Sequence, residues 1–385
     1  MKKEEIKMNI NKITHMILAA ALASGLFAAE GLGVFKGDGV KKISVQSSDI
    51  RQITCKGMEL SANIVGADVN SIELYISKKP MSDGQLKEAE LSKDESKEAQ
   101  NGVSIDKKEL KIDIAKKNED GKYLTVYTPK NISVIVTFSS GDVKINGIKG
   151  ELLLDGKSMD TDISGVSGVI NYRNKSGDLK IDGFEGVLDI KTLSGDIGLK
   201  DITGSVSVEN TSGGFELSKF EGKLNCAFQV GDVEISSSKF TGAKIDCQSG
   251  DVSLKDISGD RLELTASLGS VKIEKAELDM IEADLSAGEL ELTNVKSDID
   301  VELNLGDVSL KDFVLLGKED SSVEINFGEI SLGFKDPSSY DFLKSVKDEK
   351  IDYEAGMEID DDVRICLKNK KCLRIDTNIG GITVK

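Results

Sequence analysis

The sequence predicts an all-β fold, a single-stranded parallel β-solenoid of about 11 to 12 coils that is preceded by an N-terminal apolar helix. One observation is the motif Ser-Gly-Asp-Val, whose variants recur with a period of 18 or 19 residues. Another is an aliphatic residue four positions after each motif glycine, with polar residues beside it. A unit this short cannot bury its own apolar face, so neighbouring units must stack on one another.

The motif glycines define the repeats. The interval between Gly141 and Gly177 is twice the usual one and carries Met159 at its midpoint, so one repeat has its glycine replaced. The glycines are Gly141, Gly177, Gly195, Gly213, Gly231, Gly250, Gly269, Gly288, Gly306, Gly328 and Gly380.

The column four residues after each glycine is aliphatic in every repeat, whereas the residue just before it is polar or small. This alternation indicates strands with one buried face. The predicted inward column is Ile145, Ile163, Ile181, Leu199, Leu217, Ile235, Leu254, Ile273, Leu292, Leu310, Leu332 and Val384.

Like residues in like positions favour parallel coils stacked about 4.8 Å apart. A left-handed hexapeptide helix would repeat its inward positions every six residues, which this chain does not do, so a right-handed solenoid is favoured. Antiparallel hairpins are the alternative, because two strands in each repeat could also form a meander.

Outside the repeats, the sequence divides into segments of different character. A strand-like region without repeats is expected to cap the solenoid, and its polar stretch 82–101 is too poor in apolar residues to pack, which predicts a flexible loop. Tyr340 to Val346 could form one short helix. The predicted segments are 1–35 (signal or anchor), 36–130 (β cap), 131–335 (solenoid), 336–362 (irregular insertion) and 363–385 (final β repeat).

The N-terminal segment joins four lysines, Lys2, Lys3, Lys7 and Lys12, to an apolar stretch from Met16 to Ala29. This pattern predicts a signal peptide or an uncleaved membrane anchor. The best candidate cleavage site, at Ala23 to Gly25, is weak, which favours the anchor. We expect residues 16–35 to hold the protein in the membrane; secretion after cleavage is the alternative. The lysines on the two sides of the segment are close in number, so they do not by themselves set its orientation.

The chain is acidic, with 67 Asp and Glu against 50 Lys and Arg and a net charge of −17. A nucleic-acid partner is not expected, because such proteins carry basic faces. Cationic peptides, cationic proteins and metal ions suit this charge better.

The cysteines and the histidine do not indicate a catalytic site. The chain has one histidine, His15 beside the apolar segment, so the folded domain cannot hold a His-based catalytic triad. Cys226 and Cys247 occupy inward positions two residues out of step, which predicts buried thiols, and Cys55 has no evident partner. Cys366 and Cys372 could pair across a hairpin. We expect no enzyme, no catalytic residue and no cofactor.

Acidic residues directly after the motif glycines form the one constellation that could bind an ion. Stacked at coil spacing, they could share Ca²⁺, or they could cap the backbone N–H groups of the turn. Nothing matches a known calcium repeat, so capping is favoured. The candidate calcium ladder is Asp142, Asp178, Asp196, Asp232, Asp251 and Asp307.

Two motifs carry a family resemblance: Leu124-Thr-Val-Tyr-Thr-Pro-Lys130, and Ile135-Val-Thr-Phe-Ser-Ser-Gly-Asp-Val-Lys-Ile145 with its copies. Residues 40 to 385 resemble a bacterial β-strand-repeat family of adhesin-like proteins whose function is unknown. The resemblance implies a cell-envelope protein with the β-domain outside the cytoplasm, since relatives include membrane-anchored proteins of Lia-type envelope-stress systems. It implies a non-enzymatic adhesin or sensing module. The alternatives are a β-helical polysaccharide-active enzyme and a scaffold that polymerises end to end.

Overall fold

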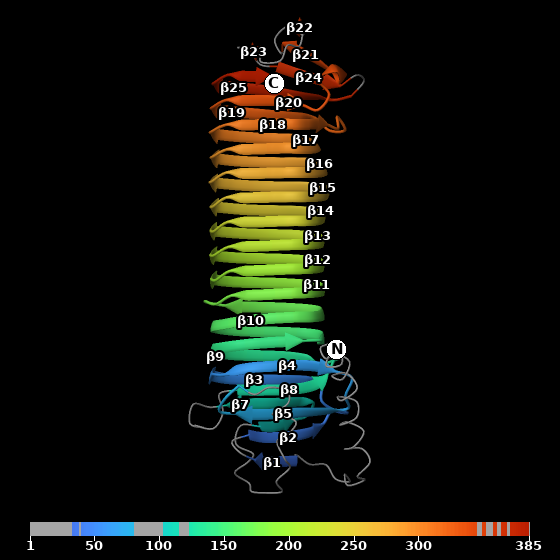
Figure 1. The fold of residues 1–385 in the computed structure, drawn as a ribbon, viewed down its shortest axis with the longest axis vertical. Helices are drawn as coiled ribbons and strands as arrows, with labels where there is room; N and C mark the ends of the chain where they lie inside the picture. Colours follow the sequence, from blue (N-terminus) through green and yellow to red (C-terminus); the bar gives the residue numbers. More distant parts are fainter. Residues whose placement is uncertain are drawn as a thin grey trace, which may run out of the picture. The chain divides into compact units, whose positions relative to one another are not determined.

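The computed structural model describes residues 33–37, 40–80, 103–114, 123–344, 349–351, 357–359, 363–367 and 370–384. They form a parallel β-solenoid of about 11 turns, so the predicted fold class is confirmed (Figure 1). The predicted loop 82–101 lies outside the described residues, as does the apolar segment up to residue 32; residues 33 to 35 belong to strand β1 (Gly33–Gly37). No helix in the part of the chain that is described is long and apolar enough to span a membrane.

The regular stack runs through long strands that bend around the corners of each coil (Figure 1). Each pairs in parallel with the coil before and the coil after it; Ile181, for example, lies opposite Ile163 and Leu199. The antiparallel alternative is therefore wrong for these repeats. The strands are β9 (Ser133–Asn146), β10 (Lys149–Asn174), β11 (Leu179–Ser194), β12 (Ile197–Ser212), β13 (Phe215–Val230), β14 (Val233–Ser249), β15 (Val252–Leu268), β16 (Val271–Ala287), β17 (Leu290–Leu305), β18 (Val308–Leu315), β19 (Ser321–Phe327) and β20 (Ile330–Phe334).

The core consists of columns of apolar side chains that run through the stack. Every residue of the predicted inward column, from Ile145 to Val384, is at most 2% exposed. Larger side chains fill neighbouring columns, and the rings of Phe215 and Phe228 lie 5.2 Å apart. Each coil therefore buries its apolar face against its own other sides and against adjacent coils, as the short period requires.

In the coil of β12, residues with a positive φ stand at three places. The first is the motif glycine, Gly195 (φ 129°), and the third is a second glycine, Gly204 (φ 132°). Between them Asp201 has a left-handed φ of 54°. A polar residue also adopts this conformation in later coils, at Lys219, Ser237, Asp256, Lys275, Asn294 and Asp312.

The N-terminal strands extend the stack in a non-sequential order. The pair β3 (Gln52–Glu59) and β4 (Ser61–Ala67) lies between β9 on one side and the pair β7 (Glu109–Ile114) and β8 (Tyr123–Pro129) on the other, all in parallel. Parallel pairing thus begins at Gln52, earlier than the repeats indicate. The remaining strands are antiparallel: β2 (Val40–Gln46) on β5 (Ser71–Ser77), β5 on β8, and β6 (Val103–Asp106) on β7.

At the C-terminal end, β25 (Cys372–Ile379) and β26 (Ile382–Val384) add the last coil, pairing in parallel with β19 and β20. Their other edges pair antiparallel with β24 (Val363–Leu367) and β23 (Met357–Ile359). The short helix expected at Tyr340 to Val346 is wrong. After a 3₁₀ turn at Pro337–Ser339, Tyr340–Lys344 forms β21, which pairs with β22 (Glu349–Ile351) and β24, because Phe342 must be buried in the cap.

The cysteines lie as the sequence predicts. Cys366 and Cys372 stand opposite each other on β24 and β25 and form a disulfide with a Cα separation of 4.2 Å. Cys226 pairs in register with Ile245, and Cys247 with Phe228, so the two thiols are out of step and both are free and buried.

Candidate functional site

The predicted ladder residues all lie exposed at one corner of the solenoid. Their carboxylates accept hydrogen bonds from backbone N–H groups of the next coil: Asp178 from Asp196 at 3.0 Å, and Asp196 from Gly214 at 2.8 Å. In the same way, Asp232 accepts from the Asp251 N–H, Asp251 from the Ser270 N–H and Asp307 from the Glu329 N–H. These carboxylates cap amides, as the favoured interpretation expects, but across coils and not within one turn.

The spacing of the ladder carboxylates bears on the calcium interpretation. Asp178 and Asp196 stand in adjacent coils, as do Asp232 and Asp251, whereas the other ladder neighbours are two or three coils apart. Five of the six carboxylates already accept an amide proton through one oxygen. No group of three or more Asp, Glu, His or Cys side chains within the described ranges is placed to hold a metal ion. At Asp142, the backbone N–H donates to Ser61 Oγ at 3.3 Å, which ties this corner to β4.

The position just before the motif glycine changes character along the solenoid. In the early coils it is serine, at Ser140, Ser158, Ser176, Ser194 and Ser212. In the late coils it is apolar, and five such residues stand opposite one another in consecutive coils. We call this row the apolar ridge: Leu268, Ala287, Leu305, Phe327 and Ile379. Leu268, Leu305, Phe327 and Ile379 are 59%, 56%, 48% and 62% exposed.

Carboxylates border the apolar ridge on both sides. One row lies two residues after ridge residues and consists of Glu289, Asp307 and Glu329. The other lies three residues before ridge residues and consists of Asp284, Glu302, Glu324 and Asp376. We call these two rows the acidic flanks. They lie within about 7 to 11 Å of the ridge backbone, because each residue of an extended chain spans at most about 3.6 Å.

The acidic flank that precedes the ridge in sequence lines a shallow groove of about 440 Å³. Its lining includes Asp284, Glu302, Glu324 and Asn304. Along the groove, Asn326 donates to Asn304 at 3.0 Å and Asn378 donates to Asn326 at 2.5 Å. The groove has one basic side chain, Arg374, whose Nε lies 2.6 Å from Asp376 Oδ2. The groove is therefore polar and predominantly acidic.

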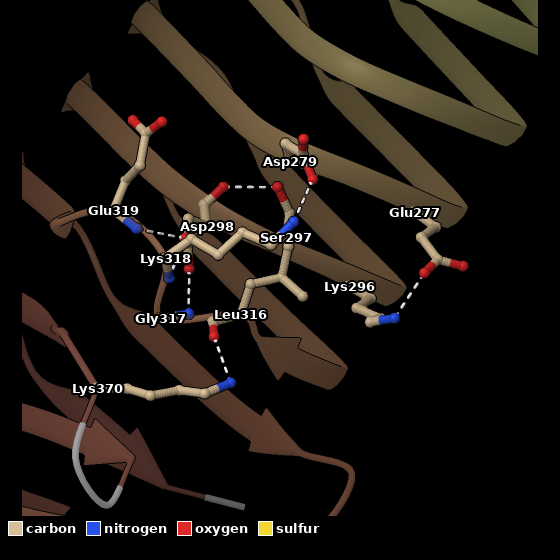
Figure 2. Close-up of polar contacts among 10 residues, drawn as sticks. All are labelled: Glu277, Asp279, Lys296, Ser297, Asp298, Leu316, Gly317, Lys318, Glu319 and Lys370. Carbon is tan, nitrogen blue, oxygen red and sulfur yellow. Dashed lines mark hydrogen bonds and ion pairs between the residues drawn. The ribbon is translucent and has the colours of Figure 1, made fainter.

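One aspartate of the late coils is completely buried. Asp298 accepts hydrogen bonds from three consecutive backbone N–H groups, those of Gly317, Lys318 and Glu319, at 2.5, 2.7 and 2.8 Å (Figure 2). Lys318 Nζ reaches back to Asp279 at 2.7 Å. A buried carboxylate is tolerated when several donors satisfy it, and these amides do so.

The loop that Asp298 holds, residues 316–320, is the insertion that separates β18 from β19. It is also held from the C-terminal side: Lys370 Nζ donates to the Leu316 carbonyl at 2.8 Å, and Lys371 Nζ lies 3.0 Å from Asp320 (Figure 2 shows the first). Asp298 therefore has a structural role, fixing this loop beside the last coils. The sequence signal was the 22-residue interval between Gly306 and Gly328, longer than any other in the regular stack.

The free thiols are poorly suited to nucleophilic chemistry. Burial raises the pKa of the Cys55 thiol to about 12, and burial also raises the pKa values of the Cys226 and Cys247 thiols. A thiol attacks as its thiolate, so these groups stay protonated and unreactive at neutral pH.

The model of the family described as Toastrack DUF4097 matches residues 40–239 and 218–384. Comparison with curated proteins gives no match. Among solved structures, one named as a candidate lipid-binding protein from Parabacteroides distasonis is 13% identical, covering 77% of this chain and 92% of its own, with a TM-score of 0.21. A TM-score this low carries no argument about this chain. The family match supports the β-solenoid fold and does not bear on adhesion or envelope stress.

Proposed function

The chain belongs to the Toastrack DUF4097 family, and from this premise we propose that it is a non-enzymatic protein of the cell envelope, held at the membrane by its N-terminal segment, whose solenoid binds a partner in adhesion or sensing. The apolar ridge is the observation that supports a binding role. Leu305, Phe327 and Ile379 are each about half exposed and lie in one row, and contiguous exposed apolar side chains mark interaction sites.

The rigidity of the scaffold supports the same role. Four of the five ridge residues, all but Ile379, adjoin a motif glycine whose amide donates to a carbonyl of the next coil, as in Gly306 N–H to the Phe327 carbonyl at 2.9 Å. The ridge is thus held in place by the backbone ladder before any partner arrives. Preorganised surfaces of this kind lose little conformational entropy on binding.

Two further features support an extracytoplasmic location. The disulfide between Cys366 and Cys372 is of a kind that forms and persists in oxidising compartments and is rare in the cytosol. The basic and apolar N-terminus has the composition of a signal or anchor segment. The paired edges of β25 and β26 favour a capped solenoid over one that polymerises end to end.

Protease digestion of whole cells or protoplasts tests this proposal. We expect added protease to remove the β-domain from intact protoplasts while a cytoplasmic marker protein survives. The chain should also sediment with membranes, and washing at high salt should leave it there. Full protection of the β-domain in intact protoplasts, with digestion only after lysis, would contradict the proposed location.

A further inference from the structure

We propose that the apolar ridge and its acidic flanks bind a basic amphipathic α-helix contributed by another polypeptide, laid along the solenoid axis. This inference rests on the proposed function, in that it names the partner of the binding surface. It depends on three properties of the late coils: the spacing of the ridge, the sign of the charge beside it, and its restriction to one part of the stack.

The spacing suits a helix. Adjacent ridge residues belong to adjacent parallel strands, so they lie about 4.8 Å apart. An α-helix presents one apolar residue per turn at about 5.4 Å, close to this spacing, whereas alternate residues of an extended strand lie about 6.7 Å apart. The five ridge positions span about 19 Å, which corresponds to about 13 residues of helix.

The charge beside the ridge sets the sign of the partner. Seven acidic residues border the ridge on its two sides, at the positions given above, and Arg374 is the one basic lining residue of the groove. An amphipathic helix with Leu or Ile on one face and Lys or Arg on both borders would place its apolar stripe on the ridge and its cations against the flanks.

The same charge disfavours two other occupants. An anionic lipid surface would be repelled by both flanks, and a second copy of this chain would bring another net charge of −17 and a like-charged flank. Lys and Arg side chains on both borders of the helix would be attracted by the carboxylates of both flanks. The aliphatic parts of these side chains can cover the edges of the ridge.

The early coils supply a natural comparison. Ser140, Ser158, Ser176, Ser194 and Ser212 occupy the ridge position there. Serine is therefore compatible with the backbone at this corner. The double substitution Leu305→Ser and Phe327→Ser should remove the ridge and leave the fold intact.

Titration of the full-length chain, kept in solution in zwitterionic nanodiscs, tests the inference. The probe is a synthetic 14-residue peptide of Leu and Lys with leucines at i, i+3, i+4 and i+7, measured by fluorescence anisotropy with empty nanodiscs subtracted. We expect the Leu305→Ser and Phe327→Ser double variant to bind the peptide at least about tenfold more weakly than the unmodified chain does. Leu193→Ser is the matched control, because Leu193 is 55% exposed but lies outside the ridge, and its affinity should not change.

Charge variants separate this site from diffuse attraction. Glu302→Gln with Glu324→Gln should weaken binding and reduce its dependence on salt, whereas Glu185→Gln with Glu221→Gln, in the early coils, should do neither. A peptide of the same composition with strictly alternating Leu and Lys should bind less well. The inference would be overturned if the ridge double variant bound the peptide as tightly as the unmodified chain does. Equal losses of affinity in the two glutamine double variants would also overturn it. Ridge-dependent dimers in light scattering, or tighter binding to anionic vesicles than to the peptide, would also overturn it; the protoplast result is independent of these outcomes.

Discussion

Replacing Ile181 by Asp is expected to lower the free energy of unfolding by about 4 kcal/mol or more. Ile181 is 1% exposed and lies between Ile163 of the coil before and Leu199 of the coil after. An aspartate there would bury an unpaired carboxylate in an aliphatic column, with no donor to satisfy it. Because neighbouring coils stabilise one another, the loss should affect the stack on both sides of the substitution.

The control is the adjacent residue. Lys180 is exposed on the outer side of the same strand, so Lys180→Asp should change the free energy of unfolding by at most about 1 kcal/mol. Urea denaturation followed by far-ultraviolet circular dichroism of both variants gives the comparison. Similar midpoints for Ile181→Asp and Lys180→Asp would show that the assignment of inner and outer faces is wrong.

Replacing Gly195 by Ala should cost about 3 kcal/mol or more, although the change adds one methyl group. Gly195 has a φ of 129°, which L-residues rarely adopt. Its new Cβ would lie 2.2 Å from the Gly177 carbonyl oxygen of the preceding coil. That oxygen belongs to the backbone of the stack, so it cannot move aside without disturbing the coil spacing.

Gly198 is the matched control for this substitution. It lies in the same coil, its φ is outside the left-handed range, and the nearest atom to an added Cβ is Lys180 Cγ at 3.9 Å. Gly198→Ala should therefore be neutral or slightly stabilising, since alanine reduces the entropy of the unfolded chain. Melting temperatures of the two alanine variants give the test, and a loss at Gly198 that equals the loss at Gly195 would refute the stacked-corner explanation.

The repeated part of the fold could be predicted because the information is local. Each coil carries its own glycine, its own alternating strand and its own inward column, so aligning copies on the glycine revealed the columns from Ile145 to Val384. The possible pairing of Cys366 with Cys372 rested on a short separation around a hairpin, and the structure contains that disulfide. Both inferences need only residues that are close in sequence or repeated at a fixed period.

Other features depend on information that the repeat does not contain. The position of β3 between β7 and β9, and of β4 between β8 and β9, is a long-range pairing choice, and any alternating strand could have made it. From the coil of β12 onward, the second corner is occupied by Asp201, Lys219 and other polar residues, which give no unique signal for a left-handed conformation; earlier coils have Gly147, Gly165 and Gly183 there. Tyr340 to Val346 has helix-compatible spacing, but the need to bury Phe342 against β24 selects a strand.

The candidate site was only partly visible in the sequence. The acidic ladder was found, because it follows the motif glycine, but its hydrogen bonds to the next coil depend on the stacking register. The apolar ridge was missed, although the change from Ser212 to Leu305 and Phe327 at the position before the glycine is a sequence signal. Alone, an exposed leucine is unremarkable; only the register places these residues in one row.

Carboxylate labelling read out by mass spectrometry, with and without the Leu/Lys peptide, tests most directly whether the late coils form the binding surface. The account predicts that saturating peptide lowers the labelling of Glu302 and Glu324 on the acidic flanks, while Glu185 and Glu221, exposed on the early coils, label as before. A uniform fall along the whole solenoid, or protection of Glu185 and Glu221 alone, would contradict a binding surface at the apolar ridge.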